Sequence, residues 1–136
     1  MKKLIYFALF FAVSILVGCG NNDPKVYTSI IGSWSCKENN PITGQRIYIV
    51  DIDRKKSDTT QYVLSNFYNV NVLEFVIAKL SANTLTILPL QQVGTQQQLE
   101  VKAGSGVVSS DFRRIVFTYK IFDGLSDFEV QATYSR

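Results

Sequence analysis

The chain of 136 residues contains no histidine. This absence excludes imidazole metal ligands, imidazole general bases and the Ser-His-Asp and Cys-His catalytic groups. Cysteine is nearly as scarce, with only Cys19 and Cys36. We expect Cys36 to be buried, because it shares the strand face of Trp34 two residues earlier. An intermolecular disulfide or a nucleophilic role for Cys36 is the less favoured alternative, since no histidine is present to activate the thiol.

The chain also lacks an apolar run long enough to cross a membrane. The run at residues 4–17 follows Lys2 and Lys3 and would extend ~21 Å as a helix, against a hydrocarbon core of ~30 Å. A basic start and a short apolar middle are typical of a secretory signal. We therefore predict a signal peptide over residues 1–18 that is removed on export.

The end of this run, Leu16-Val17-Gly18-Cys19, resembles the lipobox that signal peptidase II recognises in bacterial lipoproteins. The resemblance implies cleavage before Cys19, a diacylglycerol on its sulfur and usually a third acyl chain on its new amino group. Two or three chains hold a protein on a membrane almost permanently, because each buried CH₂ contributes ~0.8 kcal/mol. We expect a lipid-anchored protein of the cell envelope, in the outer membrane of a Gram-negative bacterium. The alternative is an ordinary secretory signal with a chance cysteine.

Without its first eighteen residues the chain has no excess of one charge. Those residues hold two lysines and no acidic residue, which leaves twelve basic and eleven acidic side chains. This near balance provides no broad positive field for a phosphate backbone, so we expect no nucleic-acid partner. The membrane, reached through the lipid on Cys19, is the expected partner. With Cys19 acylated, no disulfide can form within the mature chain.

The mature chain shows β-branched and aromatic residues alternating with polar ones, and no sustained apolar repeat at helical spacing. This pattern is typical of strands. A polar tether at residues 19–29 precedes a single all-β domain at residues 30–136. Eight strands are predicted, over residues 31–37, 45–53, 59–67, 72–80, 84–90, 97–103, 113–122 and 127–134.

Short connections join these strands, which favours antiparallel neighbours. The predicted inward rows include Phe117 with Tyr119, Val130 with Tyr134, and Leu73, Phe75 and Ile77. The segment 104–106, Gly-Ser-Gly, indicates a bulge or corner rather than a phosphate-binding loop, because no helix follows it. An eight-stranded meander with one buried face closes into an antiparallel up-and-down barrel, which removes the exposed edges.

Three short motifs resemble those of lipocalins. Gly32-Ser33-Trp34 opens the first predicted strand, like the Gly-x-Trp signature whose tryptophan closes the base of that eight-stranded barrel. Ser110-Asp111-Phe112 precedes the seventh strand and is similar to the Thr-Asp-Tyr motif of lipocalins. Arg136 follows the last strand, where the family often places an arginine against the tryptophan. The resemblance implies that Gly32, Trp34 and Arg136 form a barrel-closing motif.

The segments 66–69, 83–87 and 115–119 also resemble a largely uncharacterised group of small lipocalin-like (calycin-like) bacterial lipoproteins. This second resemblance spans most of the mature domain and implies no activity, cofactor or site residues.

Six aromatic residues are candidates to line a cavity in such a barrel: Tyr48, Phe75, Phe117, Tyr119, Phe128 and Tyr134. They can equally form ordinary core, since an eight-stranded barrel is either filled by side chains or holds one small ligand. Bulky aromatic residues favour the filled interior.

Asp51 and Asp53 share a strand face, as an acid and base pair would require. The basic residues that follow at 54–56 favour a solvated strand end instead. Neither a metal nor a cofactor is indicated by any motif.

Taken together, these features predict a non-catalytic, lipid-anchored β-barrel module of the cell envelope that binds a small apolar ligand or a protein partner. The alternative is a structural or surface accessory lipoprotein that acts only through protein contacts. An enzyme that uses Asp51 and Asp53 is the least favoured reading.

Overall fold

The computed structural model describes residues 24–95 and 98–136, so the predicted signal peptide and Cys19 lie outside the described residues. These residues are all-β apart from one 3₁₀ turn, η1 (Phe67–Asn69). Within the described ranges, no helix has the length and apolar character needed to cross a bilayer. The strands in chain order are β1 (Gly32–Asn40), β2 (Gly44–Arg54), β3 (Gln61–Ser65), β4 (Phe75–Ser81), β5 (Thr84–Ile87), β6 (Gln91–Val93), β7 (Leu99–Val108), β8 (Arg114–Phe122) and β9 (Asp127–Ser135).

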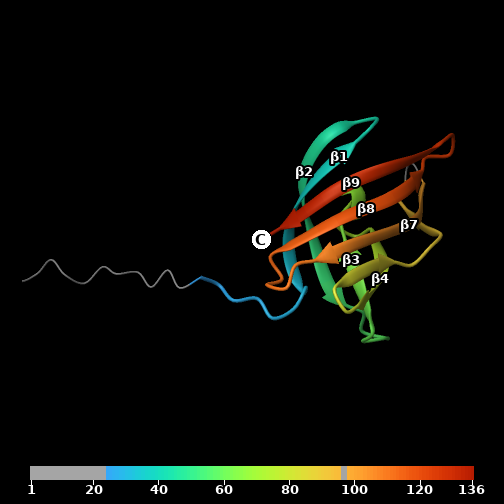
Figure 1. Ribbon diagram of the computed structural model, residues 1–136. Helices are drawn as coiled ribbons and strands as arrows, with labels where there is room; N and C mark the ends of the chain where they lie inside the picture. The colour runs from blue at the N-terminus through green and yellow to red at the C-terminus, as the bar shows by residue number, and fades with distance from the viewer. Residues whose placement is uncertain (1–23, 96–97) are drawn as a thin grey trace, which may run out of the picture.

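The strands form one antiparallel barrel that is closed by the pairing of β1 with β9 (Figure 1). Two segments, β5 and β6, pair with successive parts of β7, at residues 104–107 and 99–101. They act as one strand that is interrupted by Pro89, which has no N–H, and Leu90, which has a φ of 59°. The barrel therefore has eight strands around its wall, and the predicted eight-stranded antiparallel barrel is confirmed.

The alternating strand directions give the barrel two distinct ends (Figure 1). One end, here called the base, carries both ends of the described chain and the connections at residues 55–60, 82–83 and 109–113. The other end, here called the mouth, carries the connections at residues 41–43, 66–74, 94–95 and 123–126.

Aromatic side chains pack the interior between the base and the mouth. Phe67 and Tyr119 have ring centroids 4.7 Å apart, and Phe117 and Tyr134 stack at 5.7 Å. These four side chains are buried, as is Trp34 nearer the base. Their close contacts explain why the interior forms one continuous core.

Two glycines in β7 make room for these rings. Gly104 lies opposite Tyr119 and Gly106 lies opposite Phe117. A Cβ added at Gly106 would overlap Phe117 Cδ2, and one at Gly104 would lie 2.8 Å from Tyr119 Cβ. The β7 and β8 register shifts just before them, between residues 101 and 103, so the bulge adjoins the glycines rather than containing them.

Gly106→Ala is expected to destabilise the barrel by about 1–3 kcal/mol, because the new methyl group overpacks the Phe117 ring. Urea denaturation measures this loss, and adding Phe117→Leu should recover part of it. Ser105→Ala, on the exposed face of the same strand, is the matched control and should change the stability by about 0.5 kcal/mol or less. A Gly106→Ala chain as stable as the parent would contradict the close approach.

The inward row predicted for β4 is wrong. Val76 and Ala78 are buried, whereas Phe75 is 49% exposed and Leu73 lies in the preceding loop. This segment is apolar on both faces, so alternation alone does not identify the inner one. The smaller side chains face an interior that aromatic rings already fill.

Candidate functional site

Gly32, Trp34 and Arg136 meet at the base. Trp34 is fully buried, and its Nε1 donates a hydrogen bond to the Ile30 carbonyl at 2.9 Å. The Arg136 guanidinium lies 4.1 Å from the Trp34 ring centroid. Gly32 has a φ of 123°, and a Cβ there would lie 3.3 Å from Arg136 Nη1. These contacts close the base with a stacked tryptophan and arginine.

Arg136 also joins separate segments of the base through backbone carbonyls. Its Nε donates to Phe112 at 2.7 Å, its Nη1 donates to Ile31 at 2.8 Å, and its Nη2 donates to Ser29. Phe112, the last residue of the Ser-Asp-Phe motif, has a φ of 54°. One guanidinium therefore connects the β7–β8 loop to the segment that precedes β1.

Part of the predicted tether contacts the base as well. Arg113 Nη2 donates a hydrogen bond to the Lys25 carbonyl at 2.6 Å. The Tyr27 ring lies 4.1 Å from the Arg136 guanidinium and 5.7 Å from that of Arg113. The segment from Lys25 onward is thus fixed to the closed end of the barrel.

A buried carboxylate lies at the mouth side of the aromatic interior. Glu38 on β1 is fully buried. Its Oε2 accepts hydrogen bonds from the hydroxyls of Tyr48 and Tyr119, the latter at 2.5 Å. Its Oε1 accepts from Arg46 Nε at 3.0 Å and from Arg46 Nη2. Four hydrogen bonds and one ion pair satisfy this buried charge.

The three hydrogen-bond partners of Glu38 are held in their donating protonation states. Burial raises the pKa of Tyr48 and of Tyr119, so both hydroxyls remain donors. Burial acts to lower the pKa of Arg46, but the hydrogen bond and charge of Glu38 outweigh it and the pKa is raised. Arg46 therefore stays charged beside the carboxylate.

Neither Glu38 nor Arg46 was singled out by sequence reasoning. A signal was present, because Glu38 and Asn40 share the strand parity of Trp34 and Cys36, and all four are buried. A charged residue in an inward row requires a partner inside the barrel. The alternation of apolar and polar residues cannot identify that partner, because the contact between Glu38 and Arg46 depends on the register of β2 against β1.

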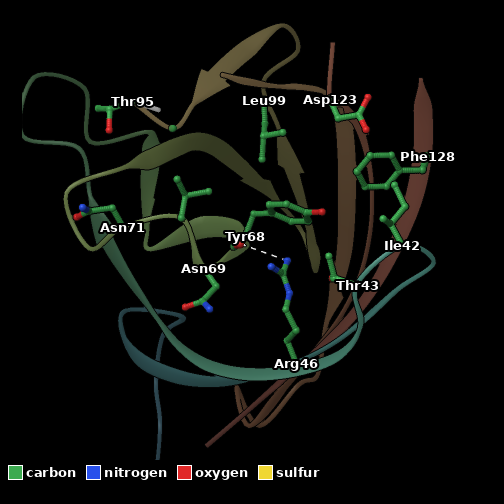
Figure 2. A pocket seen from close by; sticks show the side chains of 12 residues that line it. Ile42, Thr43, Arg46, Tyr68, Asn69, Asn71, Thr95, Leu99, Asp123 and Phe128 are labelled. Atoms are coloured by element: carbon green, nitrogen blue, oxygen red, sulfur yellow. Dashed lines mark hydrogen bonds between the residues drawn. The ribbon is translucent and has the colours of Figure 1, made fainter. Parts of the chain in front are cut away.

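A pocket of about 570 Å³ opens at the mouth (Figure 2). Its polar lining comes from several mouth connections and from β2: Thr43, Arg46, Asn69, Asn71, Thr95 and Asp123. Its apolar lining includes Leu99 and Phe128, at the mouth ends of β7 and β9. The pocket thus combines hydrogen-bonding groups with an aromatic wall, as binding sites for small molecules commonly do.

Arg46 links the pocket to the buried carboxylate. Its Nη2 donates to the Tyr68 carbonyl at 3.3 Å, and its guanidinium lies 4.4 Å from the Tyr68 ring (Figure 2). Its Nη1 donates to no residue that the structure describes. Arg46 can therefore offer N–H donors to the pocket while Glu38 balances its charge.

The backbone around Tyr68 is strained. Asn66, Tyr68 and Asn69 have φ values of 57°, 60° and 56°. Asparagine tolerates this region, but a positive φ is uncommon for a bulky residue such as tyrosine. The Tyr68 hydroxyl accepts a hydrogen bond from Asn40 Nδ2, which helps to hold the ring at the mouth. Such strain is frequent where a side chain is positioned for binding.

The six candidate cavity residues do not share one cavity. Phe128 lines the mouth pocket, whereas Tyr48, Phe117, Tyr119 and Tyr134 are buried in the interior. The prediction for Phe75 is wrong, since its side chain lies on the outer face of β4.

Asp51 and Asp53 are exposed on the outer face of β2, where Asp51 accepts a hydrogen bond from Ser33. In residues 24–95 and 98–136, no group of three or more Cys, Asp or Glu side chains is arranged to hold a metal ion.

Burial of Cys36 makes the stability of the barrel pH-dependent. Desolvation raises the pKa of its thiol from 9.0 to about 12. As the pH rises, the thiol ionises in the unfolded chain before it ionises in the folded protein. The contribution of the protonated thiol to the free energy of unfolding is therefore complete below pH 9 and is lost between about pH 9 and pH 12. We expect the free energy of unfolding to fall by about 1.4 kcal/mol per pH unit within this window.

Urea denaturation at pH 8, 9 and 10 tests this expectation, with Cys36→Ala as the control that lacks the thiol. The parent should lose more stability than this variant between pH 9 and pH 10. Above pH 10 both chains should weaken further, because burial also raises the pKa of Tyr48, Tyr119 and Tyr134. If the two chains lost stability equally from pH 8 to pH 10, the pH dependence would not arise from Cys36.

No family model, curated protein or solved structure matches the chain. The architecture itself defines the class, a closed eight-stranded antiparallel β-barrel that is compatible with a lipocalin-like fold.

Proposed function

We propose that this protein is a lipid-anchored binding module of the cell envelope that captures a small ligand at its mouth without catalysis. The mouth pocket of about 570 Å³ carries the proposal. Its lining residues lie at the mouth, and the described chain begins at the opposite end of the barrel, the base. A lipid on Cys19 would therefore leave the pocket accessible.

The lining favours a small uncharged ligand that has hydrogen-bonding groups and one apolar face, such as a sugar. Asn69 and Asn71 supply amide groups and Thr43 supplies a hydroxyl, while Phe128 provides a ring for stacking. Arg46 adds donors, with its charge balanced by Glu38. A purely apolar ligand inside the barrel is less favoured, because aromatic side chains occupy that space.

Blocking the pocket tests the ligand proposal. A panel of neutral mono- and disaccharides can be screened against the purified protein by NMR chemical-shift changes. Thr43→Trp should abolish binding, because the indole fills the pocket from the exposed β1–β2 hairpin. Thr118→Trp, on the outer face of β8, is the matched control and should bind like the parent. Equal affinity in the two variants would contradict a mouth site.

The anchor is tested separately by mass spectrometry of the protein purified from membranes. The expected N-terminal peptide begins at Cys19 and carries the mass of two or three acyl chains. Cys19→Ser should release the protein from the membrane fraction. A mature chain without acyl mass would overturn the envelope assignment.

A second candidate, an accessory lipoprotein that binds another protein, is favoured by the rim of the mouth. Ile42, Val72, Leu73 and Leu125 expose large apolar side chains there, and Leu125 is 93% exposed. Exposed apolar groups of this size often mark protein contacts. Ile42 also lines the mouth pocket, so the test replaces only Val72, Leu73 and Leu125 with serine. This change should abolish the accessory role and leave saccharide binding intact, whereas Thr43→Trp should do the reverse.

A further inference from the structure

We propose that the base of the barrel docks onto anionic lipid headgroups, so that the mouth points away from the membrane. The inference rests on the proposed lipid anchor, which would bring the base close to a membrane. The positive charge of the base is a property of the barrel alone. Its partner is identified by charge: a membrane that carries negatively charged phospholipids.

Charge is distributed unequally between the two halves of the barrel. The base half comprises residues 24–35, 50–62, 79–86, 104–117 and 132–136, and the mouth half comprises the other described residues. The base half holds eight basic and four acidic side chains, whereas the mouth half holds four basic and six acidic ones. An anionic surface therefore attracts the base and repels the mouth.

Among the described residues, the basic groups of the base form no ion pairs. The salt bridges among the described residues join Arg46 to Glu38, and Lys102 and Lys120 to Asp127, all in the mouth half. In the base half, no basic group has a described carboxylate within salt-bridge distance. Lys25, Lys56 and Arg114 are also exposed, which leaves them available to phosphate groups.

The position of the lipid brings this surface to the membrane. Five residues lie between Cys19 and Lys25, and the six Cα-to-Cα steps that join them span at most ~20 Å. Lys25 in turn is fixed to the base through Arg113. The field of an anionic leaflet decays over a Debye length of ~8 Å at physiological ionic strength, which is within the reach of this short connection.

Vesicle binding by a chain that lacks the lipid tests the surface directly. A chain that starts at Gly20 retains the whole barrel, since every contact described above begins at residue 24 or later. It should sediment with vesicles of phosphatidylcholine and phosphatidylglycerol (3:1) and not with phosphatidylcholine alone. Each basic group at an anionic surface contributes roughly a fivefold factor, so K25Q/K56Q/R114Q should lower the partition coefficient by about 100-fold.

The matched control removes three positive charges from the mouth half, as K37Q/K102Q/K120Q, and should bind within about twofold of the parent. Circular dichroism and urea denaturation verify that both triple variants are folded. Equal binding to the two vesicle types, or equal losses in the two triple variants, would overturn the proposal.

The acylated mature protein provides the second test, which separates docking from anchoring. A dye is attached at Ser110→Cys in the base or at Ser126→Cys in the mouth, and energy transfer to a membrane dye reports the distance. Cys36 is buried, so the dye reacts with the introduced cysteine and not with Cys36. On anionic vesicles the base dye should lie near the membrane and the mouth dye far from it, and K25Q/K56Q/R114Q should reduce this difference to the value found on neutral vesicles. Distances that are the same on neutral and anionic vesicles would refute docking, whereas failure to remain on neutral vesicles would refute the anchor alone.

Discussion

Arg46→Met should destabilise the barrel by about 3–5 kcal/mol. The reason is Glu38, whose fully buried carboxylate would lose its only described ion-pair partner and two hydrogen bonds. Leaving one member of a buried ion pair uncompensated costs far more than losing an exposed pair. Urea denaturation at pH 7, followed by tryptophan fluorescence, measures the change in the free energy of unfolding.

The control for this variant is Arg54→Met, which removes an exposed arginine from the same strand. It should cost less than about 1 kcal/mol. Combining Arg46→Met with Glu38→Gln should recover most of the loss, because the amide is uncharged and can still bond to Tyr48 and Tyr119. If Arg46→Met and Arg54→Met proved equally mild, the ion pair would not be what stabilises the charge of Glu38.

Trp34→Ala is the second substitution with a large expected effect. It should lower the free energy of unfolding by about 3–5 kcal/mol. The substitution leaves a cavity at the base, unpairs the Ile30 carbonyl and removes the ring against which Arg136 stacks. Trp34 is the single tryptophan of the chain, so far-UV circular dichroism must follow unfolding of this variant.

Phe75→Ala is the comparison for Trp34→Ala, since it also removes an aromatic ring. Because Phe75 lies on the outer face, its loss should cost about 1 kcal/mol or less. Trp34→Phe should fall between the two, because it keeps most of the buried surface and loses the hydrogen bond. A larger loss from Phe75→Ala than from Trp34→Ala would reverse the assignment of the interior.

Alternation predicts the fold best where one strand face is apolar and the other polar. In β8, Phe117 and Tyr119 are buried while Thr118 and Lys120 are exposed, as the pattern indicated. In β4 both faces are apolar, so the pattern gave the wrong face. The interruption between β5 and β6 was not predicted either, because it depends on the local backbone at Leu90.

The candidate site was harder to predict than the barrel. Its lining belongs mostly to connections, whose approach to one another is set by closure of the sheet rather than by local sequence. Tyr68 shows this clearly, since its place at the mouth requires a left-handed backbone that no propensity rule favours for tyrosine. The contacts at the base were easier to predict, because Trp34 and Arg136 belong to short motifs at fixed places along the strands.

The pairing of β1 with β9 has a consequence for how the chain reaches its native state. During synthesis β1 is complete long before β9 exists, and in that interval one of its edges has no partner. Contacts between such distant parts of a chain slow folding, so we expect the last step to be slow compared with formation of the hairpins. An unpaired edge can also join the edge of another molecule, and the exposed Lys37 on β1 opposes that association by charge.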